Sequence, residues 1–216
     1  QNMSGNMPIL LKRFVLSLLI AASLCASGAH AQAQTPTLIV RDNTLGQSPG
    51  DIITDGNVFT IHGDEGIRRA NDTVVLHSFS DFNLAIGDTA LYTDNNVDLD
   101  TARTILTRVT GDNGSQLFGR IESLYPSADL IFVNPNGVFY GSTFELDVRQ
   151  SFHSSTADFL DMSDGTRINF TGVGVTDPIP DLSVAVPYAW GFLDAGPSTN
   201  DIVVEGFSLG EASVPS

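Results

Sequence analysis

One stretch of the chain decides the fold: residues 128–141, which read ADLIFVNPNGVFYG. Its apolar run is followed by four turn-forming residues, Asn134, Pro135, Asn136 and Gly137. Pro135 disfavours the helical region for Asn134 and fixes its own φ near the value required at the second position of a type I or II turn. Asn136 and Gly137 tolerate the conformations that follow, and asparagine side chains bond nearby backbone groups. The stretch therefore predicts a buried strand, a tight corner and a second strand.

The rest of the chain repeats this alternation of short apolar runs and turn residues. Runs rich in β-branched and aromatic residues are separated by clusters of Gly, Asn, Asp and Pro, which is typical of strands joined by turns. No stretch shows the periodicity of an amphipathic helix. The pattern thus predicts an all-β fold. Its expected strands include residues 38–40, 58–61, 74–76, 130–133, 167–170 and 202–204.

Pattern alone leaves two all-β architectures open. Phe59 and Ile61 alternate with polar residues, whereas the run at 130–133 is continuously apolar. Alternation indicates a strand with one wet face, and a continuous run indicates a strand buried on both faces. A parallel β-helix with extra strands covering one side has both kinds of strand, and so has a two-sheet sandwich. No exact repeat of about 20–25 residues is visible that would decide between them.

The N-terminal segment 1–31 has the features of a secretory signal peptide. The basic pair Lys12-Arg13 precedes an apolar run at 14–26. That run is too short to span a bilayer. Ala29-His30-Ala31 then fits the small-x-small cleavage pattern. We therefore expect cleavage between Ala31 and Gln32.

The residues after this segment form one strongly acidic domain, 32–216. They hold all 25 acidic residues of the chain and 8 basic ones, each of them Arg, a formal charge near −17. Such a chain repels phosphate backbones and anionic headgroups, which excludes nucleic acid and anionic membranes as partners. The domain also has no cysteine, because Cys25 lies in the signal segment, where Leu24 before it argues against lipidation. Neither a disulfide nor a thiolate metal site is expected.

Several short elements flank the corner in a fixed order. Arg108, Val109, Thr110 and Gly111 come before it, and Ser151-Phe152 and Thr156-Ala157 come after it. Together with the corner they resemble the two-partner secretion, or haemagglutination-activity, domain at the N-terminus of filamentous-haemagglutinin-type exoproteins. The resemblance covers roughly residues 38–175, and residues 182–209 more loosely.

Two elements depart from the family pattern. Many members carry NPNL or NPAG about forty residues before NPNG, and the matching place here holds Asp94, Asn95, Asn96 and Val97. This earlier turn therefore lacks its proline, and so does the element that begins at Arg108. The departures concern the role of these turns and leave the resemblance intact.

The resemblance implies a fold and a role. The fold is a right-handed parallel β-helix of about seven or eight rungs, with an N-terminal cap and extra-helical β-strands or hairpins. The chain crosses the inner membrane through the Sec translocon, and an outer-membrane transporter of the TpsB type with periplasmic POTRA domains recognises it. At the cell surface or beyond, it folds first and templates the coils of a longer exoprotein. The expected recognition residues are those of the corner, and the elements at 94–97 and 108–111 form a secondary motif.

Motifs for catalysis or metal binding are weak. Residues 206–210 read GFSLG, the G-x-S-x-G of a nucleophile elbow, but no histidine follows Ser208. The acidic run at 94–100 lacks the Gly and Glu of a calcium loop, although its carboxylates leave opportunistic Ca²⁺ binding open. His62, His77 and His153 show no ligand spacing. We therefore expect no catalytic residue, no metal ligand and no cofactor.

Two rival functions remain open. One is an adhesive module that itself binds glycans or surfaces. Trp190, beside Tyr188 and Phe192, offers an aromatic face for it, although packing against a strand is the preferred interpretation. The other is a polysaccharide-processing β-helix enzyme, which clustered carboxylates on one face would indicate. Host or cell-surface glycans and proteins are further expected partners of the full-length exoprotein.

The cleavage site gives the first testable prediction. The exported protein should begin at Gln32, because the Ala29-His30-Ala31 pattern ends there. Intact-mass spectrometry of the secreted chain measures this directly. A mass that retains Met7 to Ala31, or one that carries an acyl group on Cys25, would show that the assigned site is wrong.

Overall fold

A computed structural model describes residues 35–95, 98–170, 187–193 and 200–209. All of them belong to the unit Ala33–Ser216, which is separate from the unit Gln1–Gln32. The expected cleavage site at Ala31 and Gln32 lies outside the described residues. Within the described ranges no helix is long and apolar enough to cross a membrane.

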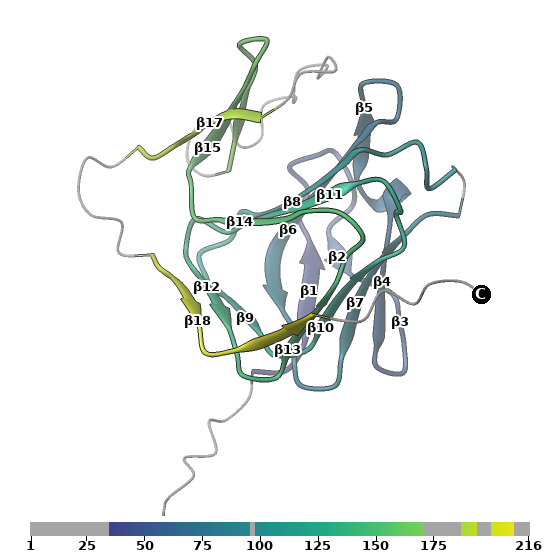
Figure 1. Cartoon of the computed structure of the whole chain (residues 1–216), viewed down its shortest axis with the longest axis vertical. Helices are drawn as coiled ribbons and strands as arrows, with labels where there is room; N and C mark the ends of the chain where they lie inside the picture. Colours follow the sequence, from purple (N-terminus) through teal and green to yellow (C-terminus); the bar gives the residue numbers. More distant parts are fainter. Residues whose placement is uncertain (1–34, 96–97, 171–186, 194–199, 210–216) are drawn as a thin grey trace, which may run out of the picture. The chain divides into compact units, whose positions relative to one another are not determined.

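Three sheets form the framework of the domain (Figure 1). Sheet A contains four strands in parallel: β6 (Val74–Asn83), β8 (Thr104–Val109), β11 (Asp129–Val133) and β14 (Phe152–Ser155). Sheet B contains five: β4 (Val58–His62), β7 (Thr89–Thr93), β10 (Arg120–Ser123), β13 (Phe144–Asp147) and β19 (Phe207–Leu209). Sheet C contains three: β9 (Ser115–Leu117), β12 (Val138–Tyr140) and β18 (Ile202–Val204).

The chain visits these sheets in a repeating order. From β8 onward it passes through sheets A, C and B, and then returns to sheet A one strand further along. Successive passes pair in parallel, so that Leu130 lies beside Ile105 and Val138 beside Ser115. The all-β class is therefore confirmed, and this parallel stacking is consistent with a β-helix. A sandwich built from hairpins would pair its consecutive strands antiparallel.

The first strands do not follow this order. β1 (Leu38–Arg41) pairs antiparallel with β6 and with β2 (Gly50–Asp51), and β3 (Thr54–Asp55) pairs antiparallel with β4. A 3₁₀ turn, η2 (Gly63–Glu65), leads to β5 (Ile67–Arg69), which also runs antiparallel to β6. These antiparallel strands use residues that would otherwise form further parallel passes of the chain. The described residues therefore contain five parallel levels in sheet B, fewer than the seven or eight expected.

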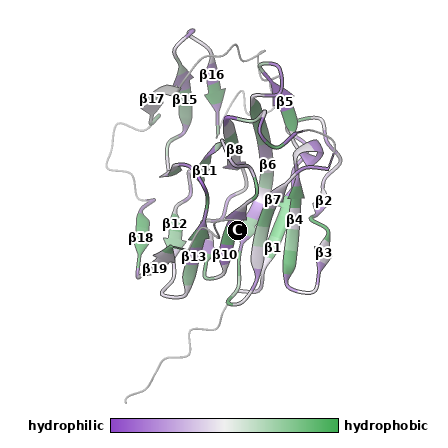
Figure 2. Cartoon of the chain, turned by 45° about the vertical axis from the view of Figure 1, so that its right-hand side comes forward, coloured by the Kyte–Doolittle hydropathy of each residue, from purple (hydrophilic) through white to green (hydrophobic). Residues whose placement is uncertain are grey.

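The main core lies between the three sheets. Residues of β8 alternate, with Ile105 and Val109 in this core and Leu106 on the opposite face. The rings of Phe79, Phe82 and Phe132 stack edge to face across it, with centroids 5.3 and 5.1 Å apart. Edge-to-face pairs of this kind add about 0.5–1.5 kcal/mol each beyond the burial of their area. Figure 2 shows hydrophobic residues on β4 and β18 and hydrophilic residues at several of the turns.

A second core covers the outer face of sheet A. A small antiparallel sheet D packs there, made of β15 (Phe159–Met162), β16 (Arg167–Asn169) and β17 (Pro187–Gly191). Leu160, Ile168 and Phe170 from this region join Ile131 and Val133 of β11 in one cluster. Sheet A is thus buried on both faces at β11, which explains why the run at 130–133 is continuously apolar.

His77 is an unusual member of the main core. Its side chain is 1% exposed and lies among the rings of Phe79 and Tyr92, with centroids 6.2 and 5.8 Å away. Neither ring nitrogen has a hydrogen-bond partner among the residues that the structure describes. Burial, and secondarily the charge of Arg68, lower the pKa of His77 to about 3. The folded domain therefore holds this histidine in its neutral form.

This burial predicts acid-sensitive stability. The unfolded chain takes up a proton near the ordinary pKa of 6.5, whereas folded His77 does not until about 3. Stability is therefore fully present above pH 6.5 and is lost as the pH falls below it, by at most about 1.4 kcal/mol per pH unit. Urea unfolding of the wild type and of His77→Phe between pH 7.5 and 5 measures the slope. His77→Phe should flatten it and exposed His153→Phe should not. Equal slopes in wild type and His77→Phe would contradict the assignment.

Candidate functional site

The corner Asn134–Pro135–Asn136–Gly137 joins β11 of sheet A to β12 of sheet C. The backbone N–H of Gly137 donates to the carbonyl of Asn134 at 3.0 Å, which closes the predicted four-residue turn. Gly137 has φ 106°, in the region that favours glycine. The backbone N–H of Asn136 donates to Oδ1 of Asn134 at 2.9 Å, so the first asparagine also folds over the turn. The corner predicted from the sequence is therefore confirmed as a turn.

Asn134 is the internal anchor of this corner. Its side chain is 0% exposed, and its Nδ2 donates to the carbonyl of Asn113 and to Oγ of Ser115, both at 3.0 Å. Its backbone N–H donates to the carbonyl of Ser155 at 3.1 Å. One residue thus bonds to the preceding pass of the chain and to the following one. A buried amide with its hydrogen bonds satisfied stabilises its site, and the loss of one partner leaves the other polar groups unpaired.

Asn136 is the exposed member of the corner. Its Nδ2 donates to the carbonyl of Gly111 at 2.6 Å, in the pass before. Its φ is not positive, so a substitution there acts through the side chain and not through left-handed backbone strain. Pro135 is buried, and its carbonyl accepts a hydrogen bond from Nδ2 of Asn200 at 2.7 Å.

Three asparagines occupy equivalent places in successive passes. The pairing of Ser115, Val138 and Ile202 puts Asn113, Asn136 and Asn200 in line, each two residues before its strand. We call them the corner asparagines. Each donates its Nδ2 toward an earlier part of the chain: Asn113 to Oδ1 of Asp81 at 3.2 Å, Asn136 to Gly111 and Asn200 to Pro135. The corner motif is therefore one level of a stacked arrangement.

The element Arg108–Val109–Thr110–Gly111 lies one pass before the corner and meets it through Gly111. The Arg108 side chain is 1% exposed, and it donates to Oγ of Ser78, to the carbonyl of Asn169 and to Oγ1 of Thr44, at 2.7–2.9 Å. Val109 lies in the main core. The guanidinium thereby ties β8 to the end of β16 in sheet D. Burial lowers the pKa of Arg108 to about 10, and the charge of Asp42 opposes that shift.

Asp42 is the acidic partner of this buried network. Its carboxylate accepts hydrogen bonds from the hydroxyl groups of Thr44, Ser78 and Thr110. Burial raises the pKa of Asp42, but these hydrogen bonds together outweigh burial and the net pKa is lowered. This network was not predicted from the sequence, because Ser78 and Thr110 lie 36 and 68 residues after Asp42 in the chain.

Asp94 and Asn95, the described residues of the earlier turn, directly follow β7 of sheet B. The Asp94 carboxylate is buried, pairs with Arg68, and accepts a hydrogen bond from the hydroxyl group of Tyr125 at 3.3 Å. Asp94 is thus part of a buried ion pair and not of a solvated loop. Asn95 is exposed, and Asn96 and Val97 lie outside the described residues.

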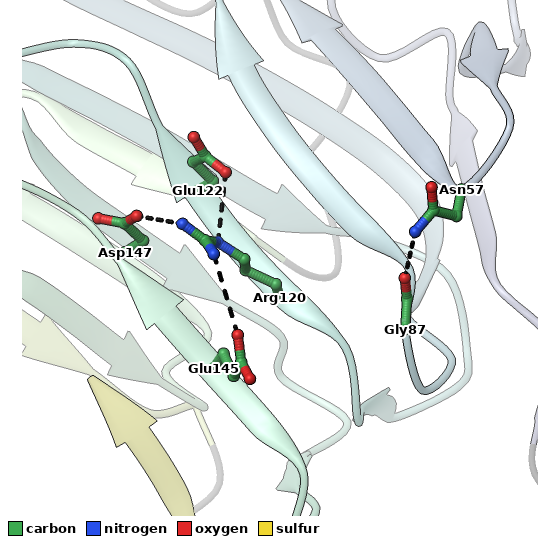
Figure 3. A network of polar contacts seen from close by, with 6 residues as sticks. All are labelled: Asn57, Gly87, Arg120, Glu122, Glu145 and Asp147. Atoms are coloured by element: carbon green, nitrogen blue, oxygen red, sulfur yellow. Dashed lines mark hydrogen bonds and ion pairs between the residues drawn. The ribbon is translucent and has the colours of Figure 1, made fainter. Parts of the chain in front are cut away.

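Acidic side chains do gather on one face of sheet B, around Arg120 (Figure 3). Nε of Arg120 lies 3.2 Å from Glu122 and its Nη1 lies 4.0 Å from Glu145, while its Nη2 contacts Asp147. All three carboxylates share this guanidinium. The cluster is an ion-pair network between β10 and β13, and on that evidence it does not favour the polysaccharide-processing alternative.

The remaining candidate residues from the sequence, Ser208 and Trp190, lie in β-strands. Ser208 lies inside β19, opposite Glu145, and not at the strand-to-helix turn that a nucleophile elbow requires. Trp190 lies opposite Leu160 and near Phe170, with ring centroids 6.3 Å apart, so it packs as expected, and its side chain is 38% exposed. Among the described residues no group of three or more His, Cys, Asp and Glu side chains is arranged to hold a metal ion.

Comparison with known proteins gives one match. A family model described as TPS secretion domain matches residues 38–211. No curated protein and no solved structure matches the chain.

The contacts of Asn134 predict a large effect on stability. Asn134→Ala removes two side-chain donors and one acceptor from a buried site, which should lower the free energy of unfolding by about 2–4 kcal/mol. Asn136→Ala removes one exposed hydrogen bond and should cost about 1 kcal/mol or less. Chemical denaturation of both variants at pH 7.5 measures the difference. Equal stabilities for the two variants would mean that Asn134 does not anchor the corner.

Proposed function

Since the chain belongs to the TPS secretion domain family, we propose that it is the secretion module of an exported exoprotein, recognised by an outer-membrane transporter of the TpsB type. Proteins with this domain are exported by two-partner secretion, with an outer-membrane transporter as partner, and the family is not one of enzymes. The match over residues 38–211 carries this proposal, because it spans nearly all of the described domain.

The proposed fold is a right-handed parallel β-helix with an N-terminal cap and an extra-helical hairpin. The parallel stacking of sheets A, B and C supports the helix. The antiparallel strands β1, β2 and β3 support a cap, because they cover the first parallel levels. Sheet D, inserted between β14 and β18, is the extra-helical part.

The proposed route begins with the Sec translocon, for which segment 1–31 is the signal. The POTRA domains of the transporter then recognise the chain in the periplasm before it folds at the surface. The absence of cysteine from residues 32–216 supports this route, because no disulfide can lock the chain before it crosses a pore. The final location, at the cell surface or in the medium, is part of the proposal.

The last described strands support a templating role. β18 and β19 are edge strands of sheets C and B. Ile202 and Val204, on the side of β18 that continues the core, are 42% and 52% exposed, and Leu209 of β19 is 71% exposed. An exposed apolar edge strand is ready to pair with another strand. We therefore propose that further coils of a longer exoprotein add there.

The corner is the proposed recognition element. Asn134, Pro135 and Gly137 become buried once the domain folds, whereas the side chain of Asn136 stays exposed, so Asn136 is the member of the corner that the transporter can contact both before and after folding. Asn134 would act by forming the turn. The two asparagines therefore have separable effects on secretion and on stability.

A secretion assay tests this division. The transporter is co-expressed with wild type, Asn136→Ile or Ser208→Ala, and the secreted fraction is measured beside the thermal melt of each purified chain. Asn136→Ile loses the side-chain hydrogen bond to the carbonyl of Gly111, so we expect a loss of stability of about 1 kcal/mol and a secreted fraction reduced by at least about twentyfold. A loss of about 1 kcal/mol corresponds to only about a fivefold change in an equilibrium constant. Ser208→Ala changes an exposed strand residue and should be secreted like wild type.

Two results would overturn the proposal in different ways. Secretion that is independent of the transporter would reject the secretion module itself. Normal secretion of Asn136→Ile, together with reduced secretion of Ser208→Ala, would reject the corner as the recognition element and leave it a structural turn.

A further inference from the structure

An open pocket of about 280 Å³ lies on the outer face of sheet C, beside the corner. It is bordered by residues of β9, β12 and β18 and by two of the three corner asparagines, Asn136 and Asn200. The pocket therefore spans three successive passes of the chain.

The floor of the pocket is apolar and aromatic. Gln116, Phe139 and Val203 lie side by side in register on the outer face of sheet C, because their neighbours Val138 and Tyr140 point into the core. The Phe139 ring rests on Phe118, with centroids 5.5 Å apart, and is itself half-buried. Val203 is 44% exposed. Packing on Phe118 fixes the Phe139 ring, which leaves part of its surface open to a ligand.

The rim carries polar groups with unused hydrogen-bonding capacity. Asp201 is exposed, and within the described part of the chain its carboxylate has no hydrogen-bond or ion-pair partner. Gln116 accepts a hydrogen bond at Oε1 from Thr35, which leaves its amide N–H groups for another acceptor. Asn136 uses Nδ2 for Gly111 and retains its carboxamide oxygen. The rim thus presents a charged acceptor, a neutral acceptor and a donor around one aromatic ring.

From this arrangement we infer that the pocket binds a neutral sugar residue of a glycan. A sugar ring has an apolar face that suits an aromatic floor and hydroxyl groups that both donate and accept hydrogen bonds, as this rim requires. The carboxylate of Asp201 selects ligands that donate. The formal charge near −17 of residues 32–216 disfavours anionic sugars. The inference goes beyond the secretion role and does not rest on it.

Binding of defined saccharides tests the site. Lactose, cellobiose and mannobiose are the probes, and saturation-transfer NMR with calorimetry on the purified exported chain is the measurement. We expect at least one of them to bind. Asp201→Ala and Phe139→Leu should each weaken that binding by about tenfold or more, since a hydrogen bond to a charged group and an aromatic contact are each lost. The matched controls Asp51→Ala and Phe192→Leu change exposed residues outside the pocket and should bind like wild type.

Several outcomes would overturn the inference. One is the absence of binding by all three saccharides, which is also the result expected if a peptide strand occupies this face. Another is binding that persists unchanged in both pocket variants, or that falls equally in the controls. If Phe139→Leu loses its β-sheet circular dichroism, the saccharide binding of Gln116→Ala is measured in its place, because Gln116 is an exposed residue of the same pocket. Because secretion is measured separately, failure here leaves the secretion module untouched.

Discussion

The hydrogen bonds of the Asn134 carboxamide are the constraint on which the parallel stack depends. Each pass of the chain must turn from sheet A into sheet C at the same height, or every strand after the turn slips out of register. Asn134 bonds to Asn113 and Ser115 of the pass before, and its backbone bonds to Ser155 of the pass after. A slip by one residue would turn buried side chains such as Val138 and Tyr140 outward. The motif thus fixes a corner, and through the corner it fixes which residues form the core.

Buried charged side chains also connect segments that lie far apart in the chain. The domain encloses two buried polar centres instead of leaving these groups at its surface. In one, Arg108 and Asp42 are linked through the hydroxyl groups of Thr44 and Ser78. The other is the ion pair of Arg68 with Asp94. Breaking a buried pair by removing one partner typically costs about 3–5 kcal/mol, because the other charge is left uncompensated. Arg108 also reaches the carbonyl of Asn169 and so holds sheet D against sheet A. Sheet D in turn covers apolar residues of sheet A that would otherwise be exposed.

The sequence predicted the local features well and the long-range ones poorly. The strands at 38–40, 58–61, 130–133 and 202–204 and the turn at Asn134 follow from residues close together in the chain, and all are present. The continuous run at 130–133 also indicated a strand buried on both faces, which sheet D explains. The antiparallel first strands and the Asp42 network were not predicted, because they depend on contacts such as Thr110 to Asp42, 68 residues apart. One signal was available: the Asn-Gly pairs at 113–114 and 136–137 recur at the spacing of the corner asparagines.

Sheet D has a consequence for the order in which the domain folds. Arg120 pairs with Glu145 across 25 residues, whereas Phe144 pairs with Phe207 across 63, since sheet D lies between them. Loop-closure entropy grows with length, so this last pairing costs about 0.8 kcal/mol more than the one before it. Four side chains of this pass also gain less from burial, because Ile202, Val203, Val204 and Leu209 are 42–71% exposed. The final pass, β18 and β19, should therefore close last and open first, which makes it the least stable of the described passes.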